Sequence, residues 1–171
     1  MLRRLLRRES ARLFLGTIAV APRRDFLRHL EDLPLLAPAP LERALHAKLV
    51  ELICVPPVSA ADALRPSDLA FDVVVQGYQF GGSMDVALGS HGFPMFWRPK
   101  VRVAARLFYA QSNKTKAVFT VTERMPWSAY MSRVLSWKVM LGLARPSTRS
   151  DLERLLEGAS QKLMDKVYRA A

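Results

Sequence analysis

One group of residues could be assembled into a hydrolytic triad, and it lies around His91. Ser90 would be the nucleophile and His91 the base, with Asp85 or Asp72 as the orienting carboxylate. Hydrolases with this chemistry hold the nucleophile on a strained strand-to-helix turn, often within Gly-x-Ser-x-Gly, and that motif is absent from the sequence. The segment is better explained as a turn. We therefore predict no catalytic residue and a protein that is not an enzyme.

The histidines, the cysteine and the glycine-rich stretches do not form a recognisable metal or cofactor motif either. His29, His46 and His91 occur without an H-E-x-x-H pattern, and Cys54 is the only cysteine. The glycines at 77–82 and 89–92 match neither phosphate-loop pattern. We predict no metal and no cofactor. Cys54 ends an apolar helical stripe, which predicts a buried, inert thiol.

Aromatic and basic side chains are interleaved between residues 93 and 106. Aromatic rings can stack on bases while arginine and lysine contact phosphate, so this pattern would suit RNA. Arg102 and Arg106 also occupy alternate positions of an expected strand, where they would form the solvent-exposed face of a half-buried sheet. Both interpretations remain open. The residues concerned are Phe93, Phe96, Trp97, Arg98, Lys100, Arg102 and Arg106.

The net charge of the chain favours an anionic partner. Its 26 basic residues outnumber 15 acidic ones, giving a formal charge of +11, and only seven of the basic residues are lysine. Arginine binds phosphate and carboxylate groups in a bidentate manner. Candidate partners are therefore acidic faces of neighbouring protein subunits, anionic lipid headgroups, or RNA.

The N-terminal segment resembles a targeting peptide in its composition. Its first 24 residues contain seven arginines and a single acid, Glu9, and a helical winding separates leucines from arginines. This pattern is typical of a mitochondrial transit peptide. A retained arm on an anionic surface is the alternative, and export is a further one because Ala19-Val-Ala21 resembles a cleavage site. The arginines assigned to an anionic surface are Arg3, Arg4, Arg7, Arg8 and Arg12.

The chain divides into an arm with a linker and one folded domain. Three prolines within residues 33–40 predict an extended linker, so we assign 1–40 to the amphipathic arm and linker and 41–171 to a single domain. Leucines at helical spacing predict a helix at about 41–54. Alternation predicts a strand at about 70–80 and a hairpin at about 100–124.

Two further helices are expected after the hairpin. The first spans about 127–143, and the second runs from a capping box formed by Ser150 and Glu153 to about residue 169. Helices packed on an antiparallel sheet form an α+β fold. We therefore expect a small antiparallel sheet (the hairpin and the strand at 70–80) packed by three helices, with an N-terminal amphipathic arm.

The expected helix at 127–143 is apolar around most of its circumference. Arg133 and Lys138 are its only charged residues. Such a helix must be buried in its own core or against a partner, and indole and phenol rings are enriched at interfaces. About 17 residues reach about 25 Å, which is marginal for crossing a bilayer. The predicted partner-binding residues are Trp127, Tyr130, Met131, Val134, Trp137 and Leu141.

These features lead to one functional hypothesis and two alternatives. The hypothesis is a non-catalytic accessory subunit of a large mitochondrial inner-membrane complex, either the ATP synthase or the respiratory chain. It would dock the apolar helix and the basic arm onto neighbouring subunits, at the inner membrane or in the matrix. The first alternative is a basic RNA-binding protein of the mitochondrial ribosome. The second is a bacterial envelope assembly factor, in which residues 15–21 form a first strand and residues from 23 onward a helix.

Overall fold

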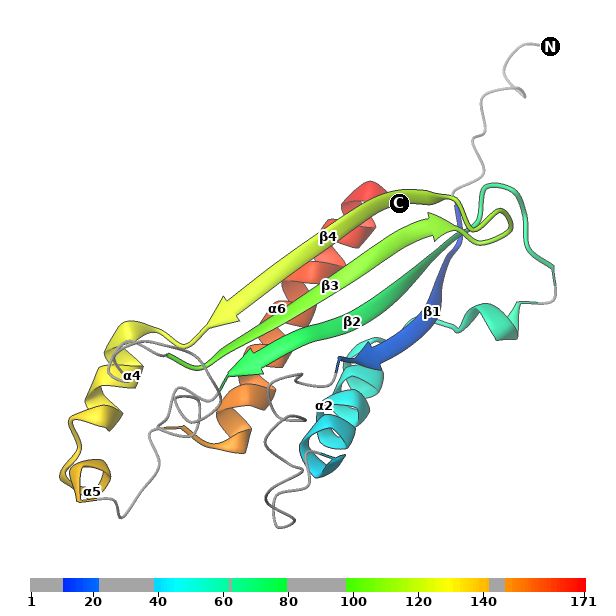
Figure 1. The fold of residues 1–171 in the computed structure, drawn as a ribbon. Helices are drawn as coiled ribbons and strands as arrows, with labels where there is room; N and C mark the ends of the chain where they lie inside the picture. The colour runs from blue at the N-terminus through cyan, green and yellow to red at the C-terminus, as the bar shows by residue number, and fades with distance from the viewer. Residues whose placement is uncertain (1–10, 22–38, 62, 80–97, 142–146) are drawn as a thin grey trace, which may run out of the picture.

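The computed structural model describes residues 11–21, 39–61, 63–79, 98–141 and 147–171. Its elements follow the expected order, with one additional strand at the start (Figure 1). They are β1 (Leu13–Val20), α2 (Ala39–Leu52), the 3-10 turn η2 (Val58–Ala60), β2 (Leu69–Gln79), β3 (Lys100–Tyr109), β4 (Thr115–Arg124), α4 (Trp127–Val134), α5 (Trp137–Met140) and α6 (Arg149–Ala170).

The sheet has the order β1-β2-β3-β4 and confirms the α+β class. Strands β2, β3 and β4 are antiparallel neighbours, as the strand at 70–80 and the hairpin at 100–124 predicted. The hairpin forms because β3 alternates buried residues such as Val101 and Val103 with outward ones such as Arg102. Asn113, with a φ of 54°, supplies the left-handed residue in the tight reversal.

The first strand corrects the predicted arm. Residues 13–20, assigned to the arm at 1–40, form β1 and pair in parallel with β2, so the sheet is mixed. At Gly16 the missing side chain lets the Asp72 carboxylate approach, since a Cβ there would lie 2.3 Å from Asp72 Oδ1. The same oxygen accepts a hydrogen bond of 2.8 Å from the backbone N–H of Thr17, beside the irregularity in the β1–β2 register. β1 is therefore built into the domain.

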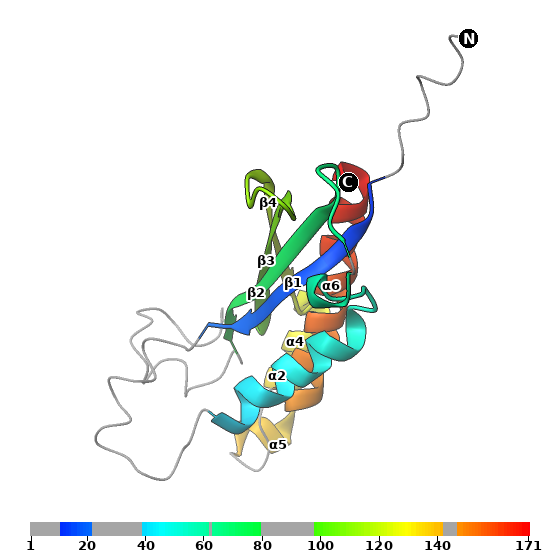
Figure 2. The same ribbon diagram turned by 90° about the vertical axis from the view of Figure 1, so that its right-hand side faces the viewer.

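Two helices cover one face of the sheet (Figures 1 and 2). α6 packs on β3 and β4, and α2 packs on β1 and α6. Leu45 and Leu49 of α2 and Leu156 of α6 are fully buried in this layer, as their helical spacing predicted. The capping box of α6 is formed by Thr148 and Asp151, two residues before the predicted pair. Among the described elements, no helix lies on the opposite face of the sheet (Figure 2).

The single helix expected at 127–143 is broken. α4 ends at Val134, and Ser136 has an extended backbone conformation, with φ −66° and ψ 133°, before α5 begins. An extended residue interrupts the ladder of backbone hydrogen bonds on which a continuous helix depends. Both short helices lie beyond the ends of β3 and β4, away from α2 (Figure 1). Within the described ranges, no helix combines the length and apolar character that spanning a bilayer requires.

Candidate functional site

The residues considered for a hydrolytic triad are not brought into a described site. Ser90, His91 and Asp85 lie outside the described residues. Asp72 accepts a hydrogen bond from the backbone of Thr17, and its carboxylate lies 3.9 Å from the Arg106 guanidinium. These contacts give Asp72 a structural role between β1, β2 and β3. Among the described residues, no three histidine, cysteine, aspartate or glutamate side chains gather as metal ligands.

The most distinctive surface is formed by residues 127–141, which we call the tip. Leu135, Trp137 and Leu141 are 62%, 61% and 67% exposed, so large apolar side chains face solvent. Leucine is among the residue types most often buried, and exposed apolar side chains that gather in one segment can mark a binding site. Leu135 was not among the predicted docking residues. Its exposure follows from the break after α4, which the sequence pattern did not reveal.

The other predicted docking residues serve different purposes. Trp127 is 42% exposed, whereas Tyr130 is 1% exposed and belongs to the core. Met131 and Val134 are half-buried and pack against that core. The six residues therefore divide into an anchoring side, centred on Tyr130, and an exposed side that continues into α5.

Aromatic and cationic contacts hold α4 to the body of the protein. The Trp127 and Tyr130 rings meet edge to face with their centroids 6.0 Å apart. The Arg98 guanidinium lies 4.7 Å from the centroid of the Trp127 ring and also donates to the carbonyl of Met125 at 3.4 Å. An arginine over an indole face is a favourable cation–π arrangement. Trp127 is thus positioned by its neighbours although part of its ring is exposed.

An ion pair joins the tip to the first turn of α6. Arg133 donates to the buried carboxylate of Asp151 at 2.5 Å, and the backbone and hydroxyl of Thr148 donate to the same carboxylate oxygen. Burial alone would raise the pKa of Asp151, but the hydrogen bonds from Arg133 and Thr148 outweigh it and lower the pKa. Asp151 therefore stays ionised near neutral pH and fixes α4 relative to α6.

Three cations lie on the open face of the sheet at the end next to the tip, and we call them the basic cluster. They are Lys100, Arg102 and Arg124. Lys100 lies directly opposite Arg124 in the β3–β4 register, and like charges placed opposite each other destabilise a sheet. All three are exposed, and none forms an ion pair with a described carboxylate. Only the hairpin register brings Arg124 to this cluster, which explains why sequence inspection missed it.

The aromatic partners predicted for these cations are not part of the described surface. Phe93, Phe96 and Trp97 lie outside the described residues. The Arg106 guanidinium donates hydrogen bonds to Thr115 Oγ1 at 2.9 Å and to the carbonyl of Asn113, and it lies over the Phe108 ring. These contacts within the chain already occupy the group. Arg102 and Arg106 lie on the open face of the sheet, the position that the second of the two sequence interpretations gave them.

Arg12, one of the arginines assigned to an anionic surface, is paired with a carboxylate of its own chain. Its guanidinium donates to both carboxylate oxygens of Asp68, at 3.2 and 2.5 Å, and to the carbonyl of Ala63. The hydrogen bond from Arg12 holds the pKa of the buried Asp68 carboxyl at about 2. This pair ties the start of β1 to the loop before β2. The remaining arginines of the predicted set, Arg3, Arg4, Arg7 and Arg8, lie outside the described residues.

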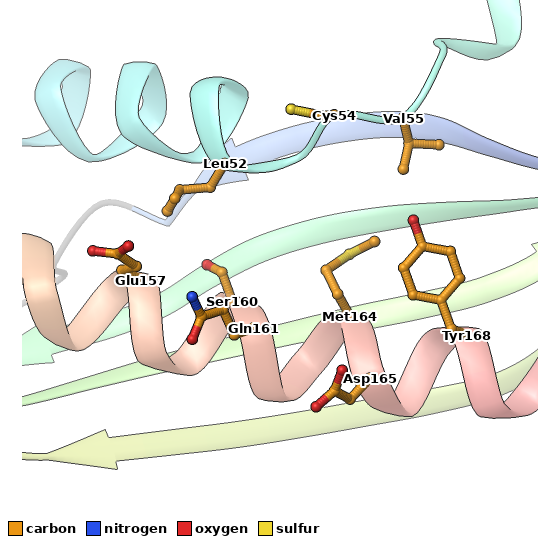
Figure 3. A pocket seen from close by; sticks show the side chains of 9 residues that line it. All are labelled: Leu52, Cys54, Val55, Glu157, Ser160, Gln161, Met164, Asp165 and Tyr168. Carbon is orange, nitrogen blue, oxygen red and sulfur yellow. The ribbon is translucent and has the colours of Figure 1, made fainter.

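A shallow pocket of about 310 Å³ lies between the end of α2 and the middle of α6 (Figure 3). Cys54 at its edge is exposed rather than buried, because α2 ends at Leu52 and the thiol falls beyond the helical stripe. The hydroxyl of Ser160 is buried and has no hydrogen-bond partner among the described residues. Figure 3 shows the carboxylates of Glu157 and Asp165 pointing in different directions, so the charged groups do not converge on one ligand position.

No family model matches the sequence, and no curated protein matches it. Similar solved structures include a protein of Xanthomonas campestris described under the family model DUF330. It is 14% identical, with 93% of this chain and 84% of that chain covered and a TM-score of 0.43. A hypothetical protein of Chlamydia trachomatis is 9% identical, with 92% and 96% covered and a TM-score of 0.41. A lipoprotein of Neisseria meningitidis is 14% identical, with 78% and 91% covered and a TM-score of 0.29.

The predicted mitochondrial identity is wrong. The similar structures described above are bacterial proteins, one of them a lipoprotein, and not mitochondrial complex subunits. This finding contradicts the location at the inner membrane or in the matrix and the ATP synthase or respiratory-chain host. β1 (Leu13–Val20) lies within the segment whose composition suggested a targeting peptide, and it pairs with β2 in the sheet.

Proposed function

We propose that the protein is a non-catalytic assembly factor of the bacterial cell envelope that docks onto its assembly through the tip. The observation that carries this proposal is the exposure of Leu135, Trp137 and Leu141, each more than 60% exposed, next to helices whose leucines are buried. Removing such side chains from water favours association with a partner that covers them.

α4, the first part of the tip, is held to the body of the protein. Tyr130 anchors α4 in the core, and the ion pair between Arg133 and Asp151 fixes the helix against α6. A preorganised surface loses less conformational entropy when it binds. Among the alternatives for this sequence, the envelope factor is the one that expected a first strand at about 15–21, and β1 occupies Leu13–Val20.

Co-purification of the tagged full chain with and without Trp137→Asp tests this proposal. A charge at the tip should release the protein from its envelope complex, seen as loss of the high-mass band in blue-native electrophoresis and of its partners in mass spectrometry. Val118→Asp is the matched control, because Val118 is 66% exposed but lies on β4, outside the tip. Unchanged co-purification of a folded Trp137→Asp variant would overturn the docking role.

A further inference from the structure

We propose that the tip and the basic cluster together bind the surface of an anionic lipid bilayer, an inference that rests on the docking role proposed above. Exposed apolar side chains of the tip would enter the region between headgroups and acyl chains. The cations of the basic cluster would remain at the level of the phosphates. The two features adjoin because β3 begins at Lys100 and β4 ends at Arg124, three residues before Trp127 begins α4 (Figure 1).

The charge around the tip complements an anionic surface. Residues 124–150 contain five basic side chains and no aspartate or glutamate. Of the four that the structure describes, Arg133 and Arg149 are paired with carboxylates of α6, whereas Arg124 and Lys138 form no ion pair with a described carboxylate. The nearest carboxylates of the body are already paired: Glu123 accepts from Lys162 Nζ at 2.6 Å, and Asp151 accepts from Arg133. This end of the protein therefore presents uncompensated positive charge. Each lysine or arginine near an anionic membrane strengthens binding about fivefold.

The apolar residues of the tip have the composition of an interfacial segment. Trp137 presents an indole ring, a group enriched at the boundary between headgroups and hydrocarbon, and the Lys138 ammonium lies 5.8 Å from its ring centroid. α5 contains four residues and α4 contains eight, so neither can cross the hydrocarbon layer. Leucine and tryptophan side chains beside exposed cations suit shallow insertion with the helices lying on the surface.

The arrangement of the basic cluster favours lipid over a folded protein partner. Protein recognition of arginine commonly uses bidentate pairs in a fixed geometry. Lys100, Arg102 and Arg124 have no ion pairs with described residues that would hold their end groups in place. Mobile headgroups can follow such unrestrained cations. They also relieve the repulsion between Lys100 and Arg124 without a matched set of carboxylates.

Vesicle binding of the full chain tests the inference. The probe is a set of vesicles made of phosphatidylcholine alone or of an equimolar mixture with phosphatidylglycerol. Trp97→Phe combined with Trp127→Phe leaves Trp137 as the only tryptophan, so a blue shift of its emission reports burial of the tip. We expect co-sedimentation and a blue shift with the anionic vesicles, and weaker binding at high salt. Sedimentation and emission that are the same with and without anionic vesicles would overturn the inference.

Matched variants distinguish this site from general attraction by the +11 charge. Lys100→Gln with Arg124→Gln should weaken binding to anionic vesicles about 25-fold. Lys114→Gln with Lys116→Gln removes the same charge at the hairpin turn, at the other end of β3 and β4, and should weaken binding less than about fivefold. Equal losses in the two double variants would overturn the basic cluster as the site.

The apolar contribution is tested in the same way. Trp137→Ala should weaken vesicle binding about tenfold or more, because the indole no longer leaves water. Tyr168→Ala is the control, since Tyr168 is exposed on α6 near the C-terminus. Equal effects of the two substitutions would overturn insertion of the tip.

Failure of this inference can be separated from failure of the docking role. If anionic vesicles do not bind but Trp137→Asp still releases protein partners, the lipid inference is wrong and the docking role stands. A tip-dependent dimer in sedimentation equilibrium, without vesicle binding, would assign the surface to a second copy of the chain and also overturn the lipid inference. If Trp137→Asp affects neither vesicle binding nor co-purification, both proposals are wrong.

Discussion

α6 and the tip are both rich in apolar side chains, but the sheet covers those of α6, whereas Leu135, Trp137 and Leu141 of the tip are exposed. Leu152, Leu156 and Leu163 are buried against β3 and β4, whereas Trp137 and Leu141 remain exposed beyond the end of the sheet. The difference lies in position rather than composition. An apolar residue stabilises the fold only where another element removes it from water, and elsewhere it is available for a partner.

The largest expected difference between the two regions is the response to truncation. Leu156→Ala should reduce the free energy of unfolding by about 2–5 kcal/mol, because it removes a fully buried side chain and leaves a cavity. Leu141→Ala, at an exposed position, should change it by less than about 0.5 kcal/mol. Urea unfolding followed by circular dichroism measures both. A comparable loss for Leu141→Ala would mean that the tip is packed like the core.

The connection between the two regions is expected to have an intermediate effect. Asp151→Ala removes the partner of Arg133 and half of the α6 capping box, so the free energy of unfolding should fall by about 1–3 kcal/mol. Glu153→Ala removes only the pair with the exposed Arg149 and should cost less than about 0.5 kcal/mol. Equal losses in the two variants would show that Asp151 does not couple the tip to the body.

A further effect should appear as a dependence of stability on acid pH, to which Asp68 in the body contributes. Asp68 has a pKa of about 2 in the folded protein, against an ordinary value of 3.8, because Arg12 hydrogen-bonds its carboxylate. A lowered pKa means that this contribution is complete above about pH 4 and is lost as the pH falls towards 2. Asp68→Asn should remove that part of the pH dependence in urea unfolding. Glu51→Gln, at an exposed pair with Lys48, serves as the control, and an identical acid profile for wild type and Asp68→Asn would contradict the assignment.

The body of the protein was largely predictable because its patterns are local. The alternation of apolar and polar residues in β3 and the spacing of the leucines in α6 each predict which face is buried. The structure places those faces in the core. The start of α6 was misplaced by a choice between neighbouring capping residues, Ser150 or Thr148, which the sequence motif alone did not resolve. β1 was obscured because its short apolar run follows an arginine-rich segment that resembles a targeting peptide.

The amino-acid sequence by itself determined the α+β class, the hairpin and the buried faces of α2 and α6. The periodicity of apolar side chains determines which face of each helix or strand must be removed from water. The tertiary structure determined which apolar residues are buried. It placed Tyr130 in the core and Trp137 in solvent, and the strand register brought Arg124 opposite Lys100. Both outcomes depend on contacts between residues distant along the chain, because burial and charge proximity are properties of neighbours in space.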